Sequence, residues 1–152
     1  MGKGIKDSAF QECLRKGKIR KFAGAKTLVS KELKISKDDI AAASHSLKEG
    51  NVKWATIQAY YSMFHAARAL IYSAGYRERS HYCLIVAVKS LFVLEGLLDI
   101  NLVEAIEVAK TLRENADYDN EFSKAAAEAL LDKAEKLLKR TEEILSLRPG
   151  SR

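Results

Sequence analysis

Proline, cysteine and long apolar runs are all scarce in this chain of 152 residues. Its one proline is Pro149, so no proline interrupts long helices over almost the whole sequence. No apolar run reaches the roughly 18 residues that a membrane-spanning helix requires. The first ten residues carry charges but no apolar stretch, so we expect no signal peptide. Together these shortages favour a helical protein that stays in the cytoplasm.

Motifs for metals and cofactors are also missing. Cys13 and Cys83 lie far apart and have no partners at metal-like spacing, which is typical of reduced thiols in a cytoplasmic protein. The histidines His45, His65 and His81 are scattered, and no glycine-rich phosphate loop is present. We therefore expect no metal ion and no bound cofactor.

Positive charge is concentrated near the N-terminus. Residues 1–37 hold 11 lysines and arginines against three acids, whereas the rest of the chain holds 15 bases and 17 acids. The first segment thus contributes +8, and the remainder −2, to the net charge of +6. Such a basic arm could follow a phosphate backbone. The plainer alternative is a solvated helix face that aids solubility.

Helix-compatible stretches occupy most of the sequence, and Gly50, Gly75 and Gly96 are placed to end three of them. Residues suited to begin a helix are Ser36, Asn51, Ser80, Asn101 with Glu104, and Ser123 or Asp119. The predicted helices lie near 5–21, 28–49, 52–74, 81–95, 101–116 and 122–147, with an interruption of the second one considered at Ser36. The run "CLIVAV" has the composition of a buried strand, but its neighbours continue a helical spacing, so we interpret it as helix.

The sequence predicts an all-α protein, an up-and-down bundle of four to five core helices plus a short basic N-terminal helix. The stretch 52–74 is apolar on most of its circumference and should be the central helix, whereas 122–147 has a one-sided apolar stripe and should lie outside. We expect a single domain with a basic arm at 1–22, a helical core at 28–147 and a frayed tail at 148–152. The broad apolar surface of 52–74 also predicts a homodimer.

The segments "AYYSMFHAARALIYSAG", "SH" and "LRENADY" closely resemble the HEPN superfamily, and in particular its small single-domain prokaryotic branch. The resemblance covers roughly residues 35–145. It implies a helical bundle, usually a symmetric dimer, with a link to nucleotides or RNA. Many members form a toxin–antitoxin pair with a minimal nucleotidyltransferase, and others are metal-independent ribonucleases.

The family's ribonuclease motif is an arginine followed, after four to six residues, by a histidine. In that chemistry a guanidinium holds the scissile phosphate and an imidazole moves protons. Arg113 matches the arginine here, but Tyr118 occupies the histidine position, and an ordinary tyrosine, with a pKa near 10, is a poor base at pH 7. The resemblance therefore makes Arg113, Asp117 and Tyr118 the candidate catalytic residues. A simple ion pair between Arg113 and Asp117, one helical turn apart, is the alternative.

Two further groups are candidates for binding a nucleotide or RNA. The first comprises Tyr61, His65, Arg68 and Tyr72, whose spacing places them along one stripe of the central helix. This stripe could face a cleft shared with Arg113, in which His65 titrates, or it could form an internal hydrogen-bonded network or a dimer seam. The second comprises Arg77, Arg79 and His81, beside a predicted helix N-terminus that favours anions. Its alternative is a structural or exposed histidine.

The leading interpretation is a dimeric HEPN protein that acts on RNA or nucleotides as half of a toxin–antitoxin-type pair with a nucleotidyltransferase. If it cleaves RNA, it would do so without metal through a modified motif, Arg113 to Tyr118. The competing interpretation is a non-catalytic module that binds a nucleotide or docks a partner through Arg113 and the 77–81 segment. A third interpretation is a structural dimer in which the polar stripe of the central helix only fixes the register of the packed helices.

Overall fold

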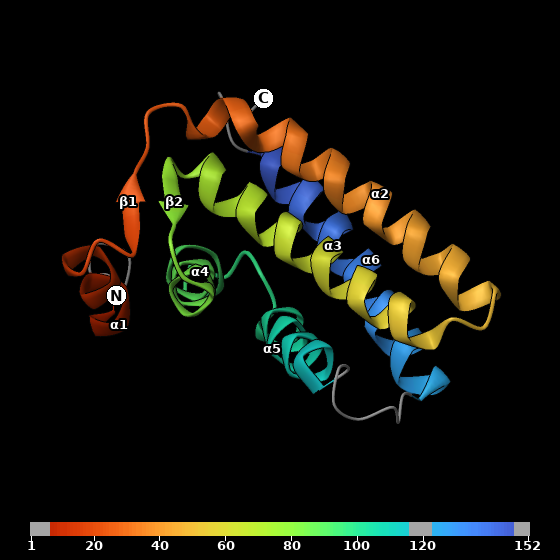
Figure 1. The fold of residues 1–152 in the computed structure, drawn as a ribbon. Helices are drawn as coiled ribbons and strands as arrows, with labels where there is room; N and C mark the ends of the chain where they lie inside the picture. Colours follow the sequence, from red (N-terminus) through yellow and green to blue (C-terminus); the bar gives the residue numbers. More distant parts are fainter. Residues whose placement is uncertain (1–6, 116–122, 148–152) are drawn as a thin grey trace.

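The computed structural model describes residues 7–115 and 123–147. Three long helices dominate it: α2 (Val29–Lys48), α3 (Val52–Ser73) and α6 (Lys124–Ser146). The helices α2 and α3 form a hairpin and α6 packs along both, while α4 (His81–Val88) and α5 (Ile100–Asn115) contact α3 (Figure 1). The prediction of an all-α bundle is confirmed. No helix in the described ranges is both long and apolar enough to cross a membrane.

Helix α3 is the centre of the bundle, as its apolar circumference predicts. Its small residues Ala59, Ala66 and Ala67 are fully buried, which lets neighbouring helix backbones approach closely. The outer helix α6 buries only the stripe that includes Ala134 and Leu137 and leaves its lysines and glutamates in solvent. The width of the apolar face thus decides which helix is enclosed.

Several predicted helix ends are confirmed. Gly50, Gly75 and Gly96 have φ angles of 77°, 86° and 77°, the left-handed conformation that glycine adopts without a Cβ penalty. The Ser80 hydroxyl accepts a hydrogen bond from the Cys83 N–H at 3.0 Å, so α4 begins where its cap predicts. Ser123 caps α6 in the same way, through the Ala126 N–H. Its alternative, Asp119, lies outside the described residues.

Other caps were predicted wrongly. Ser36 does not start or interrupt a helix, because it is fully buried inside α2 and its hydroxyl donates to the Ser62 carbonyl oxygen at 2.8 Å. Helix α5 begins at Ile100, one residue before the predicted cap Asn101, and the Asp99 carboxylate accepts a hydrogen bond from the Asn101 N–H at 2.9 Å. After α4 the chain continues as a π-helical turn over Lys89–Val93 and not as an α-helix to 95.

The N-terminal region differs most from the prediction. Helix α1 covers Ser8–Arg15 only, because Gly17 adopts a φ of 70° and the Lys18 N–H bonds to the Cys13 carbonyl oxygen. The chain then forms strand β1 (Ile19–Lys21), which pairs antiparallel with β2 (Tyr76–Glu78). A short 3₁₀ turn, Ala25–Leu28, leads into α2. Strands of three residues carry no detectable period, so the sequence pattern did not predict this ribbon.

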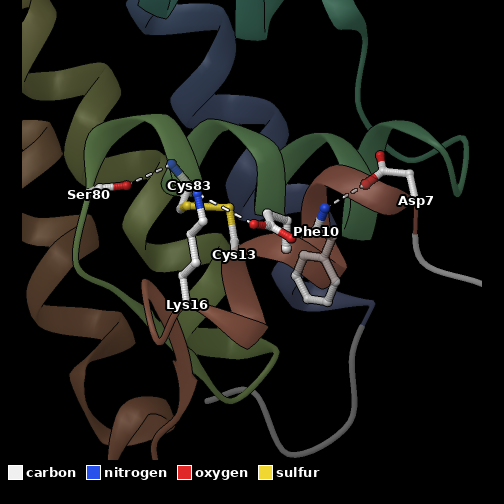
Figure 2. The surroundings of a disulfide bond; sticks show 7 residues. Asp7, Phe10, Cys13, Lys16, Ser80 and Cys83 are labelled. Carbon is white, nitrogen blue, oxygen red and sulfur yellow. Dashed lines mark hydrogen bonds and ion pairs between the residues drawn. A yellow bond between two sulfur atoms is a disulfide. The ribbon is translucent and has the colours of Figure 1, made fainter.

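A disulfide joins Cys13 of α1 to Cys83 of α4, with the two Cα atoms 5.8 Å apart (Figure 2). The interpretation of both cysteines as reduced thiols is therefore wrong. The two residues are 70 positions apart, and only the packing of α1 against α4 brings them together. The prediction of a cytoplasmic location loses the support that it drew from reduced thiols.

Candidate functional site

Arg113 lies in the last turn of α5, where the chain faces two aromatic residues of α3. Its guanidinium carbon is 5.6 Å from the ring centroid of Tyr60 and 5.3 Å from that of Tyr61, within the range of cation–π contacts. Among the described residues, no carboxylate lies within ion-pair distance of Arg113. Its predicted partners Asp117 and Tyr118 lie outside the described residues.

His81, at the start of α4, joins the same group of rings. Its imidazole stacks on Tyr60, with centroids 5.9 Å apart, and on Phe64, with centroids 6.3 Å apart. Tyr60 therefore contacts both His81 and Arg113. We call Tyr60, Tyr61, Phe64, His81 and Arg113 the aromatic–basic cluster. The sequence assigned Arg113, Tyr61 and His81 to three separate candidate groups. The cluster joins them with Tyr60 and Phe64, which the sequence did not assign to a site.

The electrostatics of this cluster keep His81 neutral. Burial lowers the pKa of His81 below its usual 6.5, and the nearby Lys110 lowers it further, whereas Glu107 and Glu114 act in the opposite direction. Its Nε2 atom is buried and has no hydrogen-bond partner within the described structure. Burial also raises the pKa of Tyr60 to about 12, although the charge of Arg113 opposes the shift. Near neutral pH the cluster thus holds an uncharged His81 imidazole and a neutral Tyr60 phenol beside the Arg113 guanidinium.

The other candidates on α3 belong to a different structure. The His65 Nδ1 atom lies 2.6 Å from an oxygen of Glu32, which is only 6% exposed. Arg68 pairs with Glu32 at 3.9 Å and with Glu78 of β2 at 3.2 Å, and it donates a short hydrogen bond to the Tyr72 hydroxyl. The Arg68–Glu78 contact is an ion pair without hydrogen-bond geometry. We call Glu32, His65, Arg68, Tyr72 and Glu78 the ion network.

The ion network is enclosed by the fold. The side chains of Arg68 and Glu78 are 20% and 9% exposed. Burial raises the pKa of the Glu78 carboxyl, while Arg68 pulls it down. Burial likewise raises the pKa of Tyr72. These groups pair mainly with one another, although the Arg68 Nε and Glu78 Oε1 atoms have no hydrogen-bond partner among the described residues, so they match the internal-network alternative for the α3 stripe.

The predicted stripe of α3 is therefore divided. Tyr61 contacts Arg113, whereas His65, Arg68 and Tyr72 belong to the ion network. Phe64 touches both groups, because Arg68 lies 5.4 Å over its ring and His81 stacks on it. Sequence reasoning missed Glu32, although a signal was present: it falls in the buried Val29–Glu32–Ser36–Ala43 series on the inner face of α2.

The predicted patch at 77–81 is divided as well. Arg77 and Arg79 are exposed on and beside β2, while His81 is half-buried in the aromatic–basic cluster. Arg77 lies 5.2 Å over the ring of Phe22, beside a pocket of about 500 Å³ that Arg20 also lines. The described residues contain no group of three or more metal-binding side chains.

Comparisons with known proteins place this geometry in context. Two proteins of Methanocaldococcus jannaschii, each named "Putative toxin", are similar to this chain. One is 33% identical over 94 residues, which is 60% of this chain and 64% of that protein. The other is 26% identical over 114 residues, which is 74% of this chain and 85% of that protein.

A Pyrococcus horikoshii protein named "UPF0332 protein" is 35% identical over 71 residues, 47% of this chain and 50% of that protein. The similarity to this protein and to the first Methanocaldococcus protein thus spans less than two thirds of their lengths. The model of the HEPN domain family matches residues 29–147, a range that includes every element from α2 to α6. This match extends over most of the sequence, and the protein belongs to the HEPN domain family.

Proposed function

We propose that this protein is a toxin-type HEPN protein that acts on RNA, as one half of a pair with a minimal nucleotidyltransferase. Family membership and the two relatives with toxin in their names support this proposal. The observation that carries it is the position of Arg113 against Tyr60 and Tyr61, beside the neutral His81. A cation set among flat rings suits a ligand with phosphates and bases.

In this proposal Arg113 holds the scissile phosphate, and the rings of Tyr60 and Tyr61 contact a neighbouring base. His81 accepts the proton of the attacking 2′-OH, because its lowered pKa leaves the imidazole uncharged at pH 7. The 2′-oxygen bonds to phosphorus as the bond between phosphorus and the 5′-oxygen breaks, and the leaving 5′-oxygen takes a proton from water, which gives a 2′,3′-cyclic phosphate and a 5′-hydroxyl. His65 is a weaker candidate for the base because Glu32 already engages it.

A second candidate function is a non-catalytic module that binds a nucleotide or docks a partner. It is favoured by the tyrosine at position 118, where the family's ribonuclease motif has histidine. Stacking rings and one cation would suffice for binding without any proton transfer. A nucleotidyltransferase partner is compatible with either function.

The chain is also proposed to be a single HEPN-like domain and a homodimer. The dimer was expected from the apolar surface of α3, but its own chain covers most of that helix, and Tyr60 is only 5% exposed. The part of α3 open to a partner would therefore be small and would include Trp54, which is 50% exposed. Light scattering at tens of micromolar protein tests this, and a strict monomer contradicts it.

The test of the proposed function uses purified protein, a labelled single-stranded RNA and mass spectrometry of the ends produced. Wild-type protein should cut RNA without added metal and leave cyclic phosphates, whereas Arg113→Ala should leave the RNA intact. Lys139→Ala, which removes an exposed cation of α6 away from the aromatic–basic cluster, is the control and should retain cleavage. Binding without cleavage, lost in Arg113→Ala, would support the second candidate function. No binding and no cleavage would contradict both.

Tyr118 is tested separately because it matches the motif position. Tyr118→Phe keeps the ring and removes the hydroxyl, so lost activity would indicate proton transfer or hydrogen bonding. Retained activity in Tyr118→Phe together with loss in Tyr118→Ala would indicate stacking. His81→Phe should abolish cleavage while RNA binding persists, and cleavage that survives this change would contradict the proposed role of His81.

A further inference from the structure

The two-stranded ribbon presents a row of cations on one face. Its register pairs Arg20 with Arg77, and the Arg79 N–H donates to the Lys18 carbonyl oxygen at 2.7 Å, which places Lys18 opposite Arg79. Directly opposite residues of an antiparallel pair share a face, and so do alternate residues of one strand. Lys18, Arg20, Arg77 and Arg79 therefore share one face. We call them the ribbon cations.

Burial confirms which side of the ribbon this is. All four ribbon cations are exposed. The other face carries Ile19, which is 1% exposed, and Glu78, whose side chain is 9% exposed and pairs with Arg68. One face of the ribbon thus closes the protein interior, and the other presents four positive charges to solvent.

This arrangement is unfavourable by itself. Like charges placed directly opposite each other in a sheet repel, and the ribbon contains two such pairs. Within the described structure no carboxylate lies at ion-pair distance from any ribbon cation. A bound polyanion would relieve the repulsion, so the charge pattern favours a ligand and not only solvation.

The ribbon is also held in place at both ends. The Phe22 N–H donates to the Gly75 carbonyl oxygen at 2.9 Å at one end. Near the other end the Cys13–Cys83 disulfide ties the helix before β1 to the helix after β2 (Figure 2). A preformed cationic surface loses less conformational entropy on binding than a flexible basic tail.

We propose that the ribbon cations bind the phosphodiester backbone of single-stranded RNA and lead it to the aromatic–basic cluster. Three of the four are arginines, whose guanidinium forks match phosphate oxygens. Arg79 is only two residues from His81 of the cluster, so the ribbon and the cluster are neighbours along the chain. This inference rests on the proposed function for its ligand. It adds a surface built partly by β1, which lies outside the residues matched by the family model.

The test compares two double variants that remove the same charge. Arg20→Gln/Arg77→Gln neutralises one opposed pair of the ribbon, and Lys26→Gln/Lys31→Gln removes two exposed cations elsewhere in the basic N-terminal segment. Binding of a fluorescent 20-nucleotide RNA is measured by anisotropy across a series of salt concentrations. Each lost phosphate contact reduces the magnitude of the negative slope of log K against log salt by about 0.7. The ribbon variant should therefore reduce that magnitude by about 1.4.

The control variant should keep the wild-type slope, and Arg20→Lys/Arg77→Lys should keep most of it because the charges remain. Equal slopes for the ribbon and control variants would overturn the proposal, since position would then not matter. Poly-glutamate is the second probe. If it binds as tightly as RNA and with the same dependence on Arg20 and Arg77, the surface recognises acidic protein, and the proposal for RNA is overturned.

Failures of the two proposals are distinguishable. Wild-type protein that binds no RNA overturns both. If the ribbon variant keeps the wild-type slope and Arg113→Ala loses cleavage, only the proposal for the ribbon cations is overturned. If the ribbon variant has a lowered slope and Arg113→Ala keeps full activity, the proposed role of Arg113 is overturned and the proposal for the ribbon cations is supported. Unchanged thermal midpoints show that the exposed substitutions leave the fold intact.

Discussion

Arg68 and Arg113 make similar contacts with aromatic rings of α3, yet their surroundings are opposite. Arg68 lies over Phe64 and Tyr72 and is neutralised by two buried carboxylates, Glu32 and Glu78. Arg113 lies over Tyr60 and Tyr61 with no described carboxylate at ion-pair distance. A charge compensated inside the fold stabilises the fold, whereas an uncompensated charge beside rings remains available to a ligand.

The largest effect that this comparison predicts is on stability at Arg68. Arg68→Met should lower the free energy of unfolding by about 3–5 kcal/mol, because it leaves the buried Glu32 and Glu78 without their cation. Urea unfolding followed by circular dichroism measures this. The double variant Arg68→Met/Glu78→Gln should recover part of the loss. A loss below about 1 kcal/mol would mean that the ion network is not structural.

The disulfide, which ties α1 to α4 beside the two-stranded ribbon, should have the next largest effect. Cys83→Ser should lower the free energy of unfolding by about 2–4 kcal/mol, because a bond between residues 70 positions apart restricts the unfolded chain. Urea unfolding with and without reductant provides the measurement. Cys13→Ser and the double serine variant should match Cys83→Ser, since all three lose one bond. Wild-type stability that ignores reductant would contradict this prediction.

Arg113→Ala should cost much less, about 1 kcal/mol, which is the size of an ordinary cation–π contact. The thermal midpoint should therefore stay close to that of the wild type while RNA cleavage or binding is lost. Calorimetry and the RNA assay are carried out on the same protein preparation. A destabilisation as large as that of Arg68→Met would place Arg113 in a buried network and remove the contrast between the two arginines.

The smallest expected effect is a pH dependence from His81. Because its pKa is lowered in the folded protein, His81 contributes stability above its unfolded pKa of 6.5, and this contribution is lost as pH falls through the folded pKa. The free energy of unfolding should decline as pH is lowered from about 7.5 to 5.5, and His81→Phe should reduce that decline. His45→Gln, which removes a histidine at an exposed position, is the control variant. A decline that His81→Phe does not alter would contradict the burial of this ring.

Helix positions were well predicted because their signals are local. The glycines at 50, 75 and 96 follow helical segments, where they supply a left-handed residue at no steric cost. The placement of α3 at the centre also followed from its composition alone. The caps at Ser36 and Asn101 failed because several residues of similar type were available, and tertiary packing chose among them.

The sequence by itself determined most of the helices, their order and the HEPN resemblance, and it made Arg113 a candidate site residue. Only the tertiary structure decided which groups meet: His81 and not His65 joins Tyr60, Arg68 and not Arg113 pairs with carboxylates of the described residues, and Cys13 reaches Cys83. Helical period and caps depend on neighbours three or four residues away, so a local pattern encodes them. Charge compensation, the disulfide and the ribbon depend on residues tens of positions apart, and their proximity exists only after the helices have packed.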